Sequence, residues 1–337
     1  MPLMPTPRGL VQQLDQSLHR SALIPRGTPR ARARLLLAIS GGADSIALLH
    51  LLHSINQSNY WHWTLIIAHI DHGLRGRAST ADAHFVQKLA RKLNLPFIAR
   101  KLKLPRNSSE ETARNARLKA LASMLRQKRC HAVIMAHHAD DQAETLLLHL
   151  FRGAGLEGLA AMAPKSQVGG LTILRPLLSI RRAALRQYLT QLGQTWREDA
   201  SNTQSLYRRN NLRNKILPQI EALWPGAAES LTRTAQLARE AHTLLESQAA
   251  DLLQRAILKR TPHRITLSRP ILRAANPLLA SHALRIAIET LDRGAPDFER
   301  TRQALQLLTT PHGKKQLEMG HDIALHLTAK TLILLNR

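Results

Sequence analysis

The chain contains a single cysteine, few aromatic residues and no long apolar run, and each shortage excludes a class of protein. With Cys130 alone it cannot form an intrachain disulfide, a Cys-x-x-Cys redox pair, a cysteine-held iron–sulfur cluster or a cysteine-based zinc site. Aromatic residues make up 3% of the 337 residues, so we expect a core of Leu, Ile, Val and Ala. No apolar run approaches the roughly 18 residues of a transmembrane helix, and the first residues lack the apolar stretch of a secretory signal. We therefore expect a cytoplasmic protein without a membrane partner.

Carboxylates are also scarce relative to basic side chains, and the imbalance predicts a polyanionic partner. The 48 Lys and Arg against 23 Asp and Glu give a net charge of +25. Such a charge favours nucleic acid or an anionic membrane surface, and a merely solvated basic surface is the alternative. Residues 1–218 carry 32 basic and 12 acidic residues, whereas residues 219–337 carry 16 and 11. The polyanion site is therefore expected mainly in the first two thirds of the chain.

The length predicts two or three domains, and proline and glycine indicate where they divide. Residues 1–34 are predicted to form a basic N-terminal segment, whose stretch 25–34 is interrupted by Pro and Gly. Prolines at 218 and 225 suggest a junction between a first domain over 35–218 and a second over 226–337. The second domain is predicted to begin with a long amphipathic helix over 227–260.

In the first half, apolar runs that favour buried strands alternate with helical patterns. The expected strands cover 35–39, 63–70, 97–102 and 132–136, and the expected helices cover 44–56, 80–94, 110–127 and 139–151. This alternation predicts an α/β fold with a parallel sheet and helices on both faces. Further helices over 278–292 and 297–309 and two short strands, 323–327 and 331–335, predict a smaller, mainly helical α+β domain at the C-terminal side.

A glycine-containing turn, Ser40–Gly41–Gly42–Ala43–Asp44–Ser45, joins the first expected strand to its helix. The glycines let the backbone approach a ligand, and free N–H groups at the helix start favour a phosphate. Asp44 beside an anion needs a metal ion or a donor between the two, unless the segment is only a capped strand–helix turn. The segment resembles the SGGxDS loop of N-type ATP pyrophosphatases, which split ATP into AMP and pyrophosphate while adenylating a substrate oxygen.

Polar clusters also follow the second and fourth expected strands. His69, Asp71 and Arg75 lie in the first cluster, and the adjacent pair Asp140 and Asp141 lies in the second. Ligands of open parallel sheets gather at the carboxyl ends of strands, so the three segments are expected to meet. Two adjacent aspartates at a helix start favour a cation, and Mg²⁺ shared with ATP phosphates fits better than zinc, which the histidines would otherwise suggest. Helix capping is the alternative without a ligand.

Taken together, the segments SGGADS, HIDHGLR and HHADDQAETLLLHLFRGAGLEGLAAM are similar to those of the tRNA(Ile)-lysidine synthetases. Segments 175–178, 196–202 and 208–213 also fit that family, so the resemblance covers about residues 35–220. It implies a PP-loop, adenine nucleotide alpha-hydrolase-like fold. It implies ATP and Mg²⁺, with free L-lysine and a tRNA(Ile) with a CAU anticodon as partners. The implied reaction adenylates C2 of the wobble cytidine and then joins lysine there, which changes codon recognition from AUG to AUA.

The resemblance also implies roles for single residues. The implied catalytic residues are Asp44, Asp140, Asp141 and Glu144, and Glu144 is expected to hold or deprotonate the incoming lysine. The implied ATP-binding residues are Ser40, Gly41, Gly42, Ala43, Asp44, Ser45, His69 and Asp71. The implied tRNA-binding residues are Arg75, Arg114, Arg117, Arg152, Arg208, Arg209 and Arg213. Asp44, Asp140 and Asp141 are the expected Mg²⁺ ligands, and Arg181, Arg182 and Arg186 are expected to form a solvated helix face.

Two departures from the family pattern limit the resemblance. Leu118 follows Arg117 where the family usually has an aromatic residue, and the chain leaves no room for the further β-rich domain of longer relatives. A tRNA thiolase of the same fold is the first alternative, although one cysteine argues against it. A non-catalytic RNA-binding protein is the second, although it would not need the carboxylates. The oligomeric state stays open, a homodimer included.

Overall fold

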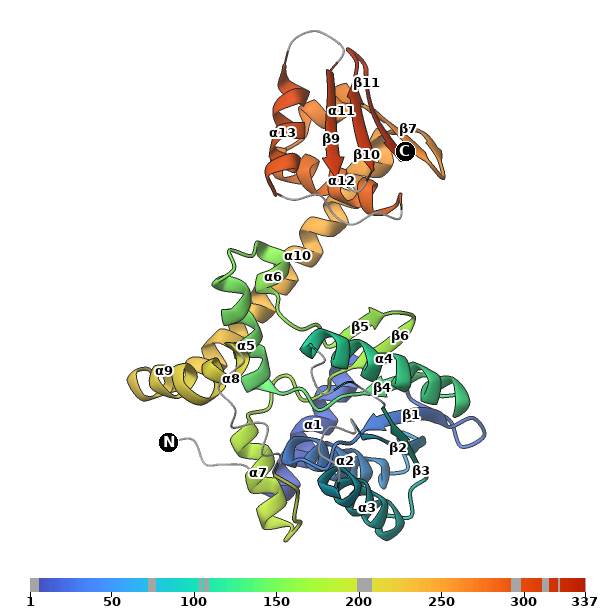
Figure 1. Cartoon of the computed structure of the whole chain (residues 1–337), viewed down its shortest axis with the longest axis vertical. Coiled ribbons are helices and arrows are strands. Elements are labelled where there is room, and N and C mark those ends of the chain that lie inside the picture. The colour runs from blue at the N-terminus through green and yellow to red at the C-terminus, as the bar shows by residue number, and fades with distance from the viewer. Residues whose placement is uncertain are drawn as a thin grey trace. The chain divides into compact units, whose positions relative to one another are not determined.

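The computed structural model describes residues 6–71, 77–102, 105, 109–198, 208–291, 298–310, 315–320 and 322–336. The chain forms two compact units, Met1–Gln236 and Leu237–Arg337, and the boundary lies within the long helix α10, Ala227–Ala256 (Figure 1). Among the residues named from the sequence, Arg75 lies outside the described ranges, as does the side chain of Arg208.

A six-stranded sheet in the order β3-β2-β1-β4-β6-β5 forms the framework of the first unit. Five strands are parallel, and β5 pairs with β6 in the antiparallel direction at one edge. The strands are β1 (Ala33–Ala38), β2 (Trp63–Asp71), β3 (Phe97–Lys101), β4 (Ala132–Ile134), β5 (Lys165–Val168) and β6 (Leu171–Leu174). The predicted parallel sheet with helices on both faces is confirmed, and the edge hairpin of β5 and β6 was not predicted.

Both faces of β1 are buried, which explains the apolar run Leu35–Ala38. Leu35 and Leu37 pack on one side, in a cluster with residues of α1, α2, α3 and α7. Leu36 and Ala38 pack on the other side against Leu121 of α4 and against β6. The helices are α1 (Pro7–Ser21), α2 (Ala43–Asn56), α3 (Arg77–Lys92), α4 (Glu110–Gln127) and α7 (Arg182–Gln191).

Helix α1 was not predicted from the sequence, although it belongs to the core. Leu10, Leu14 and Leu18 recur every four residues and are each buried in the main cluster. Thr6 caps the helix by accepting a hydrogen bond at Oγ1 from the Gly9 amide, at 3.1 Å. The segment before β1 therefore contains an element of the first unit and is not only a basic arm.

A layer of helices continues from the sheet at the end of the first unit. It contains α5 (Ala139–Leu150), α6 (Leu156–Leu159), α8 (Arg208–Asn211), the π-helical turn η2 (Leu212–Ile216), α9 (Leu217–Leu223) and the start of α10. Ala143 and Leu147 of α5 pack against Leu212, Leu217 and Ala228 in a small apolar cluster. This cluster holds α5 against the segment that carries Arg209 and Arg213.

The second unit contains a five-stranded antiparallel sheet in the order β7-β8-β11-β10-β9. Its elements are β7 (Ile257–Thr261), β8 (Arg264–Ser268), α11 (Arg269–Ala274), α12 (Pro277–Glu289), α13 (Phe298–Thr309), β9 (Lys315–Gly320), β10 (Ile323–Leu327) and β11 (Thr331–Asn336). The two short strands predicted over 323–327 and 331–335 are confirmed as β10 and β11, which pair as an antiparallel hairpin. The long helix ends at Ala256 and not at 260, because the chain enters β7 there. No described helix is long and apolar enough to cross a bilayer.

Candidate active site

The turn between β1 and α2 forms a closed set of hydrogen bonds around two serines. Oγ of Ser45 accepts from the amides of Ser40 and Gly41, each at 3.2 Å, and donates to the Gly42 carbonyl at 2.9 Å. Oγ of Ser40 accepts from the Gly42 amide at 3.3 Å. The hydroxyl groups of Ser40 and Ser45 therefore hold the loop in shape, because they accept the amides of Ser40, Gly41 and Gly42 at the start of α2.

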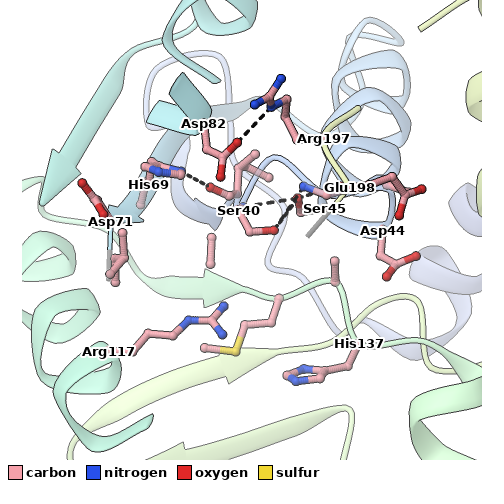
Figure 2. Close-up of a pocket in the computed structure, with 18 of the residues that line it drawn as sticks. Ser40, Asp44, Ser45, His69, Asp71, Asp82, Arg117, His137, Arg197 and Glu198 are labelled. Carbon is pink, nitrogen blue, oxygen red and sulfur yellow. Dashed lines mark hydrogen bonds and ion pairs between the residues drawn. The ribbon is translucent and has the colours of Figure 1, made fainter. Parts of the chain in front are cut away.

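Gly41 cannot be replaced without strain at this turn. Its φ of +102° lies in the region that L-residues with a side chain avoid. Its carbonyl accepts the amide of Arg197 at 2.9 Å, so the segment after α7 is attached to the loop. Arg197 in turn donates through Nε to Oδ1 of Asp82 on α3, at 2.9 Å (Figure 2). The segment after α7 therefore contacts the loop directly, and α3 is linked to the loop through Arg197.

A cavity of about 340 Å³ opens at the carboxyl ends of β1, β2 and β4. This is the edge of a parallel sheet at which ligands bind, and the volume is within the range of small-molecule sites. Figure 2 shows the loop with Asp44 and, across the cavity, Arg117 and His137. The cavity is lined by loop residues Ser40 to Ser45 except Gly41, by His69 and Asp71, and by Asp82, Arg117, His137, Arg182, Arg186, Arg197, Glu198 and Arg213.

One carboxylate oxygen of Asp44 contacts a histidine, and the other accepts no hydrogen bond within the described ranges. Oδ2 lies 3.4 Å from Nε2 of His138, whereas Oδ1 is buried and has no hydrogen-bond partner among the described residues. Nε of Arg182 lies 4.0 Å from Oδ1, at the limit of an ion pair, and it also has no hydrogen-bond partner within the described ranges. Burial alone would raise the pKa of Asp44, but the hydrogen bond to His138 and the charges of His138, Arg182 and Arg213 lower it. Asp44 is therefore ionised at neutral pH.

Asp140 and Asp141 diverge at the start of α5, and each has its own cations. Oδ1 of Asp140 accepts from Nε of Arg181 at 3.2 Å, and Oδ2 accepts from the Arg182 amide at 2.8 Å. Oδ1 of Asp141 accepts from Nη2 of Arg213 at 2.7 Å, and its Oδ2 accepts from the amide of His138 at 3.1 Å. The repulsion expected between two adjacent carboxylates is thus relieved by protein groups.

Glu144 lies one helical turn after Asp140 and faces the same arginines as Asp141. Its side chain is 1% exposed, and Oε1 accepts from Nε of Arg213 at 2.6 Å. Oε2 accepts from Nε of Arg209 at 2.9 Å and from Nη2 of Arg213 at 3.0 Å. Burial would lower the pKa of Arg213, but Glu144, Asp141 and Asp44 raise it. Arg209 and Arg213 are therefore partners of buried carboxylates at the site, and their assignment to RNA remains a prediction.

The three arginines around α7 do not form the solvated face that was expected. Arg181 pairs with Asp140, with Glu221 at 3.0 Å and with Glu229. Arg182 and Arg186 line the cavity. The expectation was wrong for Arg181 because its carboxylate partners lie on other elements, far from it in sequence, so no local pattern could show them.

The other predicted residues divide between the cavity and the surface. His69 is buried, with Nδ1 2.9 Å from the Ile39 carbonyl, and it lines the cavity beside Asp71. Burial lowers the pKa of His69, against the opposing effects of Ile39, Asp71 and Asp82. Arg117 lines the cavity and is half-buried, whereas Arg114 and Arg152 are exposed.

Two histidines that received no individual role in the sequence analysis lie at the site. Burial lowers the pKa of His137 to about 4, although Asp141 opposes the shift, so its ring is neutral at pH 7. Its Nδ1 is buried and has no partner within the described ranges. His138 is buried among the carboxylates of Asp44, Asp140 and Asp141. Their adjacency in HHADD indicated the location, but only the fold shows which carboxylates surround them.

The site can hold a hard cation at Asp44 but has no ready-made cage. Within the described ranges, no group of three His, Cys, Asp or Glu side chains is arranged to hold a metal. The unpaired Oδ1 of Asp44 suits Mg²⁺, which keeps waters and takes one or two carboxylates together with phosphate oxygens. Both oxygens of Asp140 and of Asp141 have protein partners, so their roles as metal ligands stay predictions.

The serine-lined loop, the parallel sheet and the cavity at its carboxyl edge define a PP-loop domain, and the family model of that description matches residues 11–220. A tRNA(Ile)-lysidine synthase of Solibacter usitatus (strain Ellin6076) is 35% identical over 295 residues, which cover 86% of this chain and 65% of that protein. Another, from Synechococcus sp. (strain ATCC 27144 / PCC 6301 / SAUG 1402/1), is 34% identical over 303 residues, which cover 89% of each. The chain therefore belongs to the tRNA(Ile)-lysidine synthase family.

The extent of these matches differs between relatives. The chain spans about two thirds of the length of the first relatives it matches, with 65% and 66% of their residues covered. The solved structure of a U34-tRNA thiolase from Methanococcus maripaludis has the same fold, with a TM-score of 0.56. It is 16% identical and is matched over 71% of this chain and 88% of that one.

Proposed function

We propose that this chain is a tRNA(Ile)-lysidine synthase. It would use ATP to join lysine to C2 of the wobble cytidine in the CAU anticodon of tRNA(Ile), through an adenylated base, and would release AMP and pyrophosphate. The observation that carries the proposal is a pair of buried atoms that lack hydrogen-bond partners within the described ranges, Oδ1 of Asp44 and Nε of Arg182, in a chain of this family. An acceptor and a donor side by side suit a metal ion and a phosphate oxygen.

ATP phosphates would be held by the loop and by arginines that line the cavity. Ser40 and Ser45 present hydroxyl groups there, and Arg182, Arg186 and Arg197 supply positive charge from α7 and the segment after it. Bound Mg²⁺ would supply charge neutralisation for the departing pyrophosphate. Asp44 would hold it, with Asp140 and Asp141 as the further candidates. Because the arginines are fixed before ATP arrives, their charge can stabilise the transition state without much reorganisation.

Lysine and the cytidine would meet at the α5 side of the cavity. Glu144 is the proposed acceptor for the lysine ammonium or its proton, although both of its oxygens are now bonded to Arg209 and Arg213. The base would have to leave the anticodon stack to reach the cavity, as in other enzymes that modify bases. Arg114 and Arg152 are exposed and remain candidates for phosphate contacts, together with Arg75, Arg117, Arg208, Arg209 and Arg213.

A thiolase activity is the alternative that the structural neighbour raises. A 4Fe-4S cluster held by protein thiolates needs several cysteines, and this chain has only Cys130. Cys130 lies just before β4, at the amino edge of the sheet and not at the cavity, and burial raises the pKa of its thiol. A non-catalytic RNA-binding role is disfavoured by the buried, paired carboxylates that such a protein would not need.

Pyrophosphate release from ATP tests the proposal, with lysine and the tRNA(Ile) transcript each left out in turn. Sustained release should need both, and Asp44→Asn should abolish it. The matched control is Asp251→Asn, which neutralises an exposed aspartate on α10. Equal release without RNA would contradict the proposal, and release that depends on a sulfur donor instead of lysine would favour the thiolase.

We further propose that the second domain, expected over residues 226–337, positions the tRNA body, with bracing of the first unit as the alternative. Truncation after Pro218 would remove Ala228, which packs against α5, so the cut belongs after Gln236. If the second unit positions RNA, the shortened chain should keep ATP binding and lose most tRNA affinity. Loss of ATP binding would favour bracing, and full modification would exclude both roles.

A further inference from the structure

The N-cap of α5 is His138, which makes contacts beyond those that capping requires. His138 is 1% exposed, and the Asp141 amide donates to its Nδ1 at 3.3 Å. The Asp141 side chain accepts from the His138 amide in return, which completes a capping box. Ser, Thr, Asp and Asn are the preferred residues at such a position, so capping alone does not explain an imidazole.

The far side of the ring reaches a different element. Because Nδ1 accepts a hydrogen bond, the proton of the neutral ring is on Nε2, and the imidazolium also carries one there. Nε2 lies 3.4 Å from Oδ2 of Asp44 on α2 and 3.5 Å from Oδ2 of Asp141. Oδ2 of Asp141 already accepts the His138 amide. Asp44 is therefore the nearer acceptor for the Nε2 proton, and it is the one that lies on a different helix.

We propose that His138 is a positioning residue that holds Asp44 by Oδ2 and thereby keeps Oδ1 available for a cation bound with ATP. The proposal rests on the proposed function for its consequence in catalysis. The contact links α2, the helix that follows the phosphate loop, to α5. Without it, Asp44 would be free to rotate toward Arg182, 4.0 Å away.

Two substitutions separate this role from capping. His138→Asn retains an acceptor near the position of Nδ1 and is an excellent cap, but it is too short to reach Asp44. His138→Gln places a donor near the position of Nε2 and is a poorer cap. Positioning predicts that Asn loses activity while the protein stays folded, and that Gln restores it at some expense of stability. If His138 only caps α5, His138→Asn should keep more activity than His138→Gln.

The first measurement is pyrophosphate release as a function of Mg²⁺, together with the thermal midpoint of each variant. For His138→Asn we expect kcat to fall at least about tenfold and half-saturating Mg²⁺ to rise, with KM for lysine unchanged. Its midpoint should stay within about 2 °C of wild type. His138→Gln should keep kcat within about threefold. Wild-type activity in His138→Asn, or losses in both variants that follow their midpoints, would overturn the proposal.

A second measurement needs no activity, so it separates this proposal from the function it rests on. The midpoints of His138→Asn, Asp44→Ala and the double variant form a cycle, because Ala at position 44 has no acceptor for His138. Because both single changes remove the same contact, the double variant should melt at least about 2 °C above the additive expectation. Additive shifts would overturn the link even if the enzyme is active. A wild type that releases no pyrophosphate would refute the proposed function while leaving this cycle decisive.

Discussion

The two ends of the six-stranded sheet differ in how their charges are arranged. At the carboxyl end, cations and carboxylates alternate at short range, as in the contacts of Arg213 with Asp141 and Glu144. At the amino end, the segments 25–34, 56–63, 91–96 and 126–131 hold nine basic residues and no Asp or Glu. Those residues are Arg26, Arg30, Arg32, Arg34, Arg91, Lys92, Arg126, Lys128 and Arg129.

The contacts at the amino end differ in kind from those at the cavity. The Arg26 guanidinium lies 3.9 Å from the centre of the Tyr60 ring and donates to its carbonyl, and Arg34 donates to the Lys128 carbonyl. Several of the other cations are in the last turns of helices or just after them, where they interact favourably with the helix dipole. Much of the positive charge of residues 1–218 is therefore remote from the cavity. A net charge predicts an anionic partner for the molecule, but it does not locate the reacting site.

The largest expected contrast is in stability. Arg213→Ala should lower the free energy of unfolding by roughly 3 kcal/mol, because it leaves Glu144 buried without its main partner. Arg129→Ala, at an exposed position of the amino end, should change it by less than about 0.5 kcal/mol. Urea denaturation of both variants measures the difference. Equal effects would show that the two ends do not differ in this respect.

The next contrast is in chemistry. Asp44→Asn should slow pyrophosphate release by about a hundredfold, or 2.7 kcal/mol of barrier, because the cation then loses its carboxylate. We expect the variant to remain folded, since Asn can still accept the Nε2 proton of His138. Single-turnover assays check the rate, and far-ultraviolet circular dichroism checks the fold. A rate within about threefold of wild type would remove Asp44 from the mechanism.

At the amino end the expected effect is on RNA attraction alone. Replacing Arg30, Arg32 and Arg129 by Gln should reduce the log–log salt slope of RNA binding by about 0.9 for each cation that contacts a phosphate. Release of pyrophosphate at saturating tRNA should change by less than about twofold. Filter binding over a salt series measures the slope. An unchanged slope would assign these arginines to helix and surface solvation only.

The matching substitution at the other end concerns Arg209 and Arg213. Replacing both by Gln should weaken tRNA binding if they contact phosphates, and it should also destabilise the protein, because Glu144 loses its donors. Binding must therefore be compared at a temperature where the variant is folded. A normal salt slope in the folded variant would restrict both arginines to holding Glu144.

The last contrast is a dependence of stability on pH. The pKa of His137 is about 4 in the folded protein, against 6.5 as its ordinary value. Between these values the unfolded chain binds the proton and the folded protein does not, so stability falls as the pH decreases from 6.5 to 4. His137→Asn should flatten this dependence, whereas His84→Asn, at an exposed histidine, should not. Parallel curves for wild type and His137→Asn would contradict the shift.

The parts of the fold predicted from the sequence are those whose burial leaves a local pattern. The strands β1 and β2 contain the apolar runs Leu35–Ala38 and Leu65–Ala68 because helices cover both of their faces. The strands β5, β7 and β9 were missed because they carry polar, exposed side chains, whereas β6 and β8 were missed although most of their residues are buried. Helix α1 was missed although its leucines repeat every four residues.

The site was predicted in outline for the same reason. The turn at Gly41 and the paired aspartates at 140 and 141 are local features, and the fold brings them to one edge of the sheet. The partners of the carboxylates are not local, since Arg181 and Arg213 lie 41 and 72 residues from Asp140 and Asp141. The sequence therefore could not show that arginine and histidine side chains lie against these carboxylates.

The central claim is that the cavity at the carboxyl end joins lysine to an isoleucine tRNA. Its most direct test is the incorporation of radiolabelled lysine, with ATP, into transcripts of tRNA(Ile) and tRNA(Met) that both carry a CAU anticodon. The account predicts label in tRNA(Ile) with wild type, little in tRNA(Met), and none with Asp44→Asn. Absence of label from tRNA(Ile) with the folded wild-type protein, or undiminished label with Asp44→Asn, would contradict it.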